Sequence, residues 1–166
     1  MKRIVSILVL VAVALLVAGC PSATSSTPVP ADISTAPAAS ADKFGKVIGS
    51  VSLADLDNLP LGIDITGSYS NLSAVDAIIT FANYTSDDGF TYLNGSVKLT
   101  GSMNASPAIL HESGSITISG TGGVSGTVSF NWTITTTNSG QTVTIKIVGT
   151  CTIDGVPYSV NQSTTF

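Results

Sequence analysis

A five-residue unit recurs along the chain and restricts its fold more than any other feature. The unit is a Gly, a hydroxyl residue, an apolar residue, a polar residue and a second apolar residue, starting at Gly49, Gly95, Gly114, Gly126 and Gly149. Alternation with period two puts the apolar pair on one face of a strand and the hydroxyls on the other. Because the unit starts at uneven intervals, a solenoid with one repeat per coil is excluded. The pattern predicts strands of an antiparallel meander.

Composition agrees with an all-β class, since only 10% of residues are charged and a helical bundle needs charged exposed faces. Eight strands are expected, near residues 45–53, 62–69, 76–84, 90–100, 114–120, 124–136, 142–153 and 156–164. The pattern allows two closures, a small barrel or a two-sheet sandwich. Residues 53–61 break the alternation and are expected to form a helical turn or a packed loop.

The turn between the sixth and seventh expected strands predicts their register. A two-residue turn at Ser139-Gly140 would set Phe130 opposite Gly149. An aromatic ring at that position could cover the backbone that a Gly leaves bare.

The last turn predicts a second register. Asp154-Gly155 is a strong type I′ dipeptide and would pair Cys151 with Tyr158. The last strand also contains Pro157, which lacks the N–H that a central strand needs. We therefore expect this strand to lie at an edge of the sheet.

The N-terminus is typical of a secretory signal. Lys2 and Arg3 precede an apolar run over residues 4–18, which is followed by Gly19 and Cys20. Fifteen residues in a helix would cover ~22 Å, short of the ~30 Å hydrocarbon core of a bilayer. Residues 1–19 are therefore interpreted as a signal peptide rather than a permanent span.

Val17-Ala18-Gly19-Cys20 resembles the lipobox of bacterial lipoproteins, and the resemblance covers residues 1–20 only. It implies that the thiol of Cys20 is acylated and becomes the new N-terminus, so that the membrane is the expected partner. It also implies a location in the bacterial cell envelope. Because Pro21 replaces the Asp that retains such proteins at the inner membrane, the outer membrane is expected in a host with two membranes, and otherwise the outer face of the cell membrane. The alternatives are an ordinary signal peptide cut elsewhere, which leaves a free thiol, or a permanent helical anchor.

Two further regions follow the signal. Residues 20–42 are rich in Pro, Ser, Thr and Ala without apolar periodicity, which predicts a disordered tether. Such a chain would hold the domain a mean ~25–30 Å from the lipid. Residues 43–166 form the expected β domain.

Charge limits the partners of this domain. Without Lys2 and Arg3 the chain keeps four Lys against ten acidic residues, and four minus ten gives a formal charge of −6. No Arg or basic stripe is left to hold phosphate, so nucleic acid is not an expected partner.

Catalytic residues are not expected. Cys151 occupies an apolar position of the repeated unit, so a buried structural thiol is predicted there. His111 and Glu112 belong to the loop-like stretch AILHESG, and no Gly-x-Ser-x-Gly elbow is present. A Cys–His or Ser–His site would need His111, the single His of the chain, and is therefore disfavoured.

The carboxylates do not predict a metal or a cofactor. Asp55 and Asp57 form one small group and Asp87 and Asp88 another, both in predicted turns. Neither supplies the oxygen ligands that calcium prefers, and zinc ligands are lacking. A carboxylate pair for glycoside hydrolysis stays open, because such pairs are assembled in space.

These observations favour a non-catalytic, lipid-anchored envelope protein with a structural or interaction role, whose envelope protein partner the sequence leaves open. The alternative is a carrier for a small apolar ligand inside a barrel. An enzyme is the third hypothesis, and it requires a cleft that gathers His111 with Asp or Ser side chains.

Overall fold

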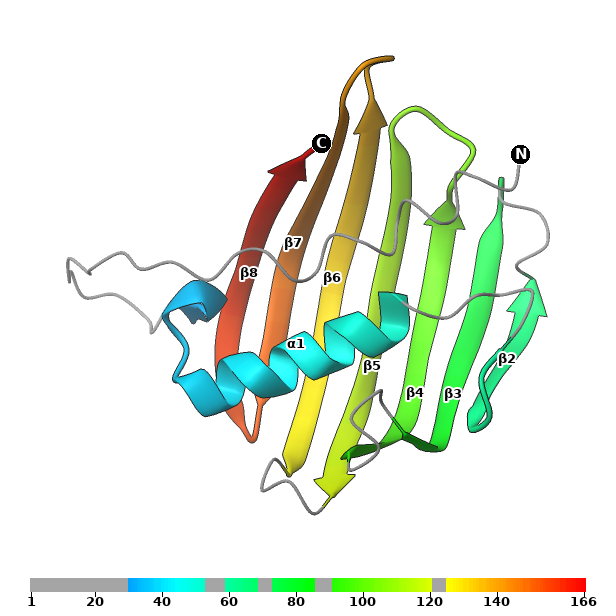
Figure 1. The fold of residues 1–166 in the computed structure, drawn as a ribbon. Coiled ribbons are helices and arrows are strands. Elements are labelled where there is room, and N and C mark those ends of the chain that lie inside the picture. The colour runs from blue at the N-terminus through cyan, green and yellow to red at the C-terminus, as the bar shows by residue number, and fades with distance from the viewer. Residues whose placement is uncertain (1–29, 53–58, 69–72, 86–90, 121–124) are drawn as a thin grey trace.

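The computed structural model describes residues 30–52, 59–68, 73–85, 91–120 and 125–166. They form one eight-stranded sheet with a single α-helix lying across one of its faces (Figure 1). The strands are β1 Ala31–Asp32, β2 Ile63–Ser68, β3 Val75–Thr85, β4 Thr91–Ser102, β5 Ala108–Gly120, β6 Gly126–Asn138, β7 Val143–Ile153 and β8 Val156–Thr165. Their spatial order is β1-β8-β7-β6-β5-β4-β3-β2.

The all-β class is confirmed, and β2 to β8 form the expected antiparallel meander. The two closures left open by the sequence are both wrong, because the strands form one sheet that does not close. The sheet is mixed, since β1 runs parallel to β8. Alternation alone specifies which face of each strand is apolar, and it carries no information on closure.

The strand expected at residues 45–53 is wrong. Helix α1, Ala38–Ser52, occupies that segment and packs against β6 and β7. Phe44, Val47 and Ile48 lie three and four residues apart, the spacing of one helical face. Val47 is fully buried and Ile48 packs against the same core. This burial outweighs the local resemblance of Gly49 and its successors to the strand unit.

The expected tether also extends too far along the chain. Within residues 31–42 the chain forms β1, the 3₁₀-helix η2 Ile33–Thr35 and the first turn of α1. Ile33 is 3% exposed and joins the core. One buried Ile and a two-residue strand therefore fix a segment whose composition is typical of disorder.

The register between β6 and β7 differs from the expected one by two positions. Ser139 N–H donates to Thr142 O, so the two central residues of the turn are Gly140 and Gln141 rather than Ser139 and Gly140. Gly140 has φ +90°, and a Gly is favoured at the first central position of a type II′ turn. As a result Trp132, not Phe130, faces Gly149. An aromatic residue does pair with the glycine, but it is Trp132 and not the residue expected there.

The register between β7 and β8 is confirmed. Cys151 pairs with Tyr158, and the turn lies at Asp154-Gly155. The edge position expected for the last strand is modified by β1, which pairs with Tyr158 and Ser159 immediately after Pro157.

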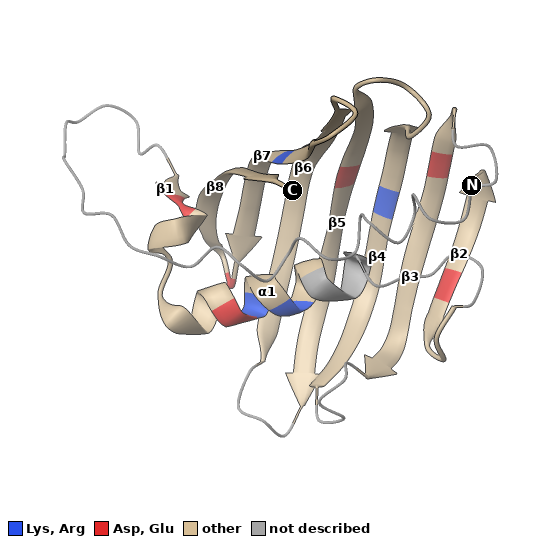
Figure 2. Cartoon of the chain, turned by 45° about the horizontal axis from the view of Figure 1, so that its top comes forward, with Lys and Arg blue, Asp and Glu red and all other residues tan. Residues whose placement is uncertain are grey.

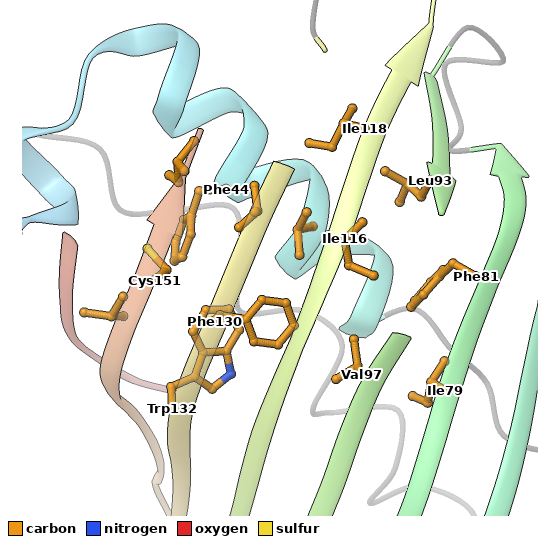
Figure 3. Packing of buried hydrophobic residues seen from close by; sticks show 14 of the residues in the cluster. Phe44, Ile79, Phe81, Leu93, Val97, Ile116, Ile118, Phe130, Trp132 and Cys151 are labelled. Carbon is orange, nitrogen blue, oxygen red and sulfur yellow. The ribbon is translucent and has the colours of Figure 1, made fainter. Parts of the chain in front are cut away.

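The core lies between the sheet and α1. Its side chains come from alternating positions on β2 to β8 and from Phe44 and Val47 of the helix (Figure 3). The opposite face of the sheet carries exposed short polar side chains, among them Ser96, Ser115 and Thr117. The period-two pattern of the sequence thus produces one buried and one solvated face.

Candidate functional site

The predicted lipidation residue, Cys20, lies outside the described residues. The described chain starts at Pro30, beside the β8 edge of the sheet. Ser159 Oγ donates to Pro30 O at 3.3 Å, and Ala31 pairs with Tyr158 in the parallel ladder. This junction fixes where an N-terminal anchor would join the domain.

A cap and a buried side chain hold the chain after the junction. Asp32 Oδ1 accepts a hydrogen bond of 2.8 Å from Ser34 N–H, and Thr35 Oγ1 donates to Asp32 O at 2.7 Å. These bonds start the 3₁₀-helix and direct Ile33 into the core. The entry point is therefore ordered by local hydrogen bonds and burial together.

An ion pair links α1 to the turn between β7 and β8. Lys43 Nζ bonds Asp154 Oδ2, and the other oxygen of Asp154 accepts from Thr127 N–H at 2.8 Å. The ammonium group of Lys43, with the Thr127 N–H, lowers the pKa of Asp154. Asp154 has φ +51°, as the Asp-Gly turn requires. One carboxylate therefore joins the helix, β6 and the β7–β8 turn.

A carboxyl group is buried on the helix-covered face. Glu112 is 7% exposed, and its Oε2 accepts a hydrogen bond of 2.8 Å from Trp132 Nε1–H. The two residues are direct cross-strand partners on β5 and β6. Burial raises the pKa of Glu112, and the bond from Trp132 opposes that rise only in part. The pair is a polar link within an apolar surface.

Aromatic rings enclose the indole of this pair. Phe130 stacks on Trp132 with centroids 4.1 Å apart and planes at 12°. Phe44 of α1 meets Trp132 edge-on at 5.9 Å (Figure 3). The helix is thus positioned by ring packing at Trp132 and by the ion pair of Lys43.

Sequence reasoning missed the Glu112–Trp132 pair, although a signal was present. Glu112 falls on the apolar phase of β5, two residues from Leu110 and from Gly114. A carboxyl residue in that phase predicts either an edge or a buried partner. Placing His111 and Glu112 in a loop hid this signal.

His111 lies in a strand, contrary to the loop expected for it. It is exposed on β5, and its Nδ1 is 2.9 Å from Thr133 Oγ1. Cys151 points to the opposite, buried face of the sheet. Successive side chains of a strand point to opposite faces of the sheet. His111 and Cys151 lie on opposite faces, so the structure does not bring them together.

The buried thiol predicted at Cys151 is confirmed. The residue is 1% exposed, and burial raises the pKa of its thiol to about 11. A thiol with so high a pKa is a weak nucleophile at neutral pH. Its position between β6 and β8 makes it part of the core (Figure 3).

Asp55, Asp57, Asp87 and Asp88 lie outside the described residues. In the part of the chain that the structure describes, no three His, Cys, Asp or Glu residues are grouped to hold a metal ion. Charged residues are spaced singly along the strands, while α1 carries several (Figure 2).

None of the helices within residues 30–52, 59–68, 73–85, 91–120 and 125–166 is long and apolar enough to cross a bilayer. Comparison with known protein families, curated proteins and solved structures finds no match to this chain.

Proposed function

We propose that the chain is a lipid-anchored protein of the bacterial cell envelope, held by an acylated Cys20, with a structural or interaction role and no catalytic activity. The observation that carries the proposal is the sequence at Cys20, where a basic start, an apolar run too short to span a bilayer and small residues before a Cys coincide. Two acyl chains at ~0.8 kcal/mol per buried CH₂ give retention that is slow to reverse.

The position of Pro30 supports this role, because it sets the reach of the anchor. Ten residue steps separate Cys20 from Pro30, 30 minus 20. At ~3.3–3.6 Å per step they span at most ~35 Å. The β8 edge would then lie within that distance of the lipid, whereas a tether ending at residue 42 would set a larger upper limit. The β2 edge lies six strand spacings away, or ~29 Å at ~4.8 Å per spacing.

The two faces of the sheet support a domain that sits in water beside the membrane. One face is packed beneath α1, and the other carries Ser, Thr and Asn at exposed positions such as Ser113, Ser115 and Asn131. Uncharged hydroxyl and amide groups keep this face solvated with few charges. The carrier hypothesis depended on a closed barrel interior, and an open sheet does not supply one.

Metabolic labelling with an alkyne analogue of palmitate in a bacterial host tests the proposal. Wild type is expected to incorporate the label and to partition into the detergent phase. C20A is expected to lose both properties, because position 20 then has no thiol to receive the diacylglyceryl group.

C151A is the matched control, since it removes the other thiol of the chain. It should be labelled like wild type. Equal labelling of C20A and wild type, or loss of label in C151A alone, would overturn the proposal.

A further inference from the structure

The free edge of β2 offers backbone hydrogen-bonding groups to another strand. In the described part of the chain β2 is the last strand of the sheet and pairs with β3 alone. An open edge of this kind is a template for a further strand. We propose that β2 pairs antiparallel with β2 of a second copy of this chain, on a two-fold axis that passes through Ile65.

The phase of β2 determines which groups face outward. Gly62 O accepts from Ala82 N–H of β3, and Ile63 N–H instead donates to Pro60 O. In an antiparallel ladder the hydrogen-bonded positions alternate. Even-numbered residues of β2 therefore bond to β3, while Ile65 and Gly67 direct their N–H and C=O groups to the open edge.

The phase limits the positions that the two-fold axis can occupy. Only registers that join odd-numbered positions of the two copies satisfy the outward groups. Centring the pair on Ile65 places Ile65 opposite its own copy in a doubly hydrogen-bonded pair. The two Ile65 side chains would extend the buried row that already contains Ile79 and Val97.

Charge excludes one neighbouring register and favours this one. Shifting the axis to Asp64 would set two like carboxylates against each other, which is destabilising. With the axis at Ile65, each Asp64 faces Thr66 of the other copy on the solvated side, where a hydroxyl can donate to the carboxylate. These are non-hydrogen-bonded positions, at which cross-strand side chains approach most closely.

The edge at the other end of the sheet is less suited to the same role. β1 covers Tyr158 and Ser159 of β8, and Pro157 adjoins this covered segment. β2 contains neither Pro nor Lys, the residues that commonly block an edge. β2 also lies at the end of the sheet farther from Pro30, the point where the proposed anchor joins the domain.

An edge pair of about six residues buries less surface than a stable interface of ~1,600 Å². The dimer is therefore weak and reversible, and cross-linking is the suitable probe. T66K would place an ammonium group opposite Asp64 of the second copy. Thr66 is exposed, so the change leaves the core untouched. A zero-length carbodiimide reagent would join the two side chains as an amide with loss of water.

The full chain, purified in detergent at ~100 µM, is treated with the reagent. T66K should give at least five times the covalent dimer of wild type, and D64N/T66K should return to the wild-type level. The matched control T117K places a lysine at an exposed position of the central strand β5, and should stay at the wild-type level.

Sedimentation provides the second measurement. T66E would place a carboxylate opposite Asp64 of the other copy at both symmetry-related positions. It should lower the association constant at least tenfold, whereas T66K should raise it. No dimer in any variant, a cross-link that persists in D64N/T66K, or equal weakening by T66E and T117E would overturn the proposal. All readouts are independent of acylation, so failure here and a bare Cys20 are distinguishable.

Discussion

Trp132 Nε1–H donates its hydrogen bond to Glu112 Oε2 at 2.8 Å across the β5–β6 ladder, on the face that α1 covers. The bond satisfies an indole donor that would otherwise be buried among apolar groups. It does so with a carboxyl whose ionised form is disfavoured by the same burial. The contribution of this pair to the stability of the core therefore depends on pH.

Replacing Glu112 with Gln should remove this pH dependence of stability. Folding raises the pKa of Glu112 above its ordinary value of 4.5, so its contribution to stability is complete below that pH and is lost as pH rises through the folded value. The free energy of unfolding of E112Q minus that of wild type should increase from pH 4 to pH 8. Urea titrations at fixed pH values measure it, and a difference independent of pH would contradict the burial of the carboxyl.

E112L separates the hydrogen bond from the charge. Leu cannot accept from Trp132 Nε1–H, and an unsatisfied buried donor costs about 1–3 kcal/mol. E112L should therefore be less stable than E112Q by about that amount, measured in the same titrations at pH 5. Equal stability would mean that the indole finds another partner.

Two Gly-to-Ala substitutions should change the stability of the fold in opposite directions. A Cβ at Gly149 would overlap backbone atoms of Asn131 and Trp132, whereas a Cβ at Gly45 on α1 meets no atom within 4 Å. G149A should be destabilised by about 1–3 kcal/mol through overpacking. G45A should gain about 0.5–1 kcal/mol through helix propensity. Thermal unfolding of both variants is the measurement, and destabilisation by G45A would contradict the helix over Ala38–Ser52.

The ion pair between Lys43 and Asp154 should have a small, salt-sensitive effect. D154N keeps an oxygen acceptor for Thr127 N–H and tolerates the positive φ, but it loses the pair. We expect a loss of at most about 1 kcal/mol at low salt, decreasing as salt is added. The pKa of Asp154 is lowered in the folded chain, so this contribution is present above the ordinary value of 3.8 and is lost as pH falls.

The exposed pair of Lys98 and Asp76, at 3.5 Å, is the matched control. D76N should change the stability less than D154N does. A larger loss of stability in D76N than in D154N would contradict a specific contribution of the Lys43–Asp154 pair.

The thiol of Cys151 should be unreactive until the chain unfolds. Its pKa of about 11 leaves little thiolate at pH 8, and its 1% exposure excludes reagents. A maleimide should label it at the rate of unfolding, and C151V should retain the fold at a cost of about 1 kcal/mol. Fast labelling of the folded chain would contradict the buried position.

Sequence periodicity predicted the strands whose alternation is regular, and it failed where tertiary contacts decide. β7 and β8 were predicted in register because Asp154-Gly155 permits one tight turn. The β6–β7 turn was displaced because Asn138, Ser139 and Gly140 are all turn residues, and Asn138 Oδ1 accepts from Gly140 N–H in the observed one. Local composition could not choose between adjacent positions of a two-residue turn.

Long-range packing explains the other differences. Ala31 pairs with Tyr158, more than a hundred residues away, and no local signal announces that contact. Phe44 becomes helical by packing on Trp132, a contact that also crosses most of the chain. Local sequence therefore predicts a tether and a strand over residues 31–52, whereas their observed structure depends on contacts with the sheet.

The N-terminus of the mature protein is the most direct test of the proposed anchor. Mass spectrometry of the terminal peptide, from protein isolated from its own membranes, should find a chain that begins at Cys20 and carries a diacylglyceryl group on the thiol. A chain that begins at another residue, or an unmodified Cys20 thiol, would contradict the anchor and the envelope role proposed from it.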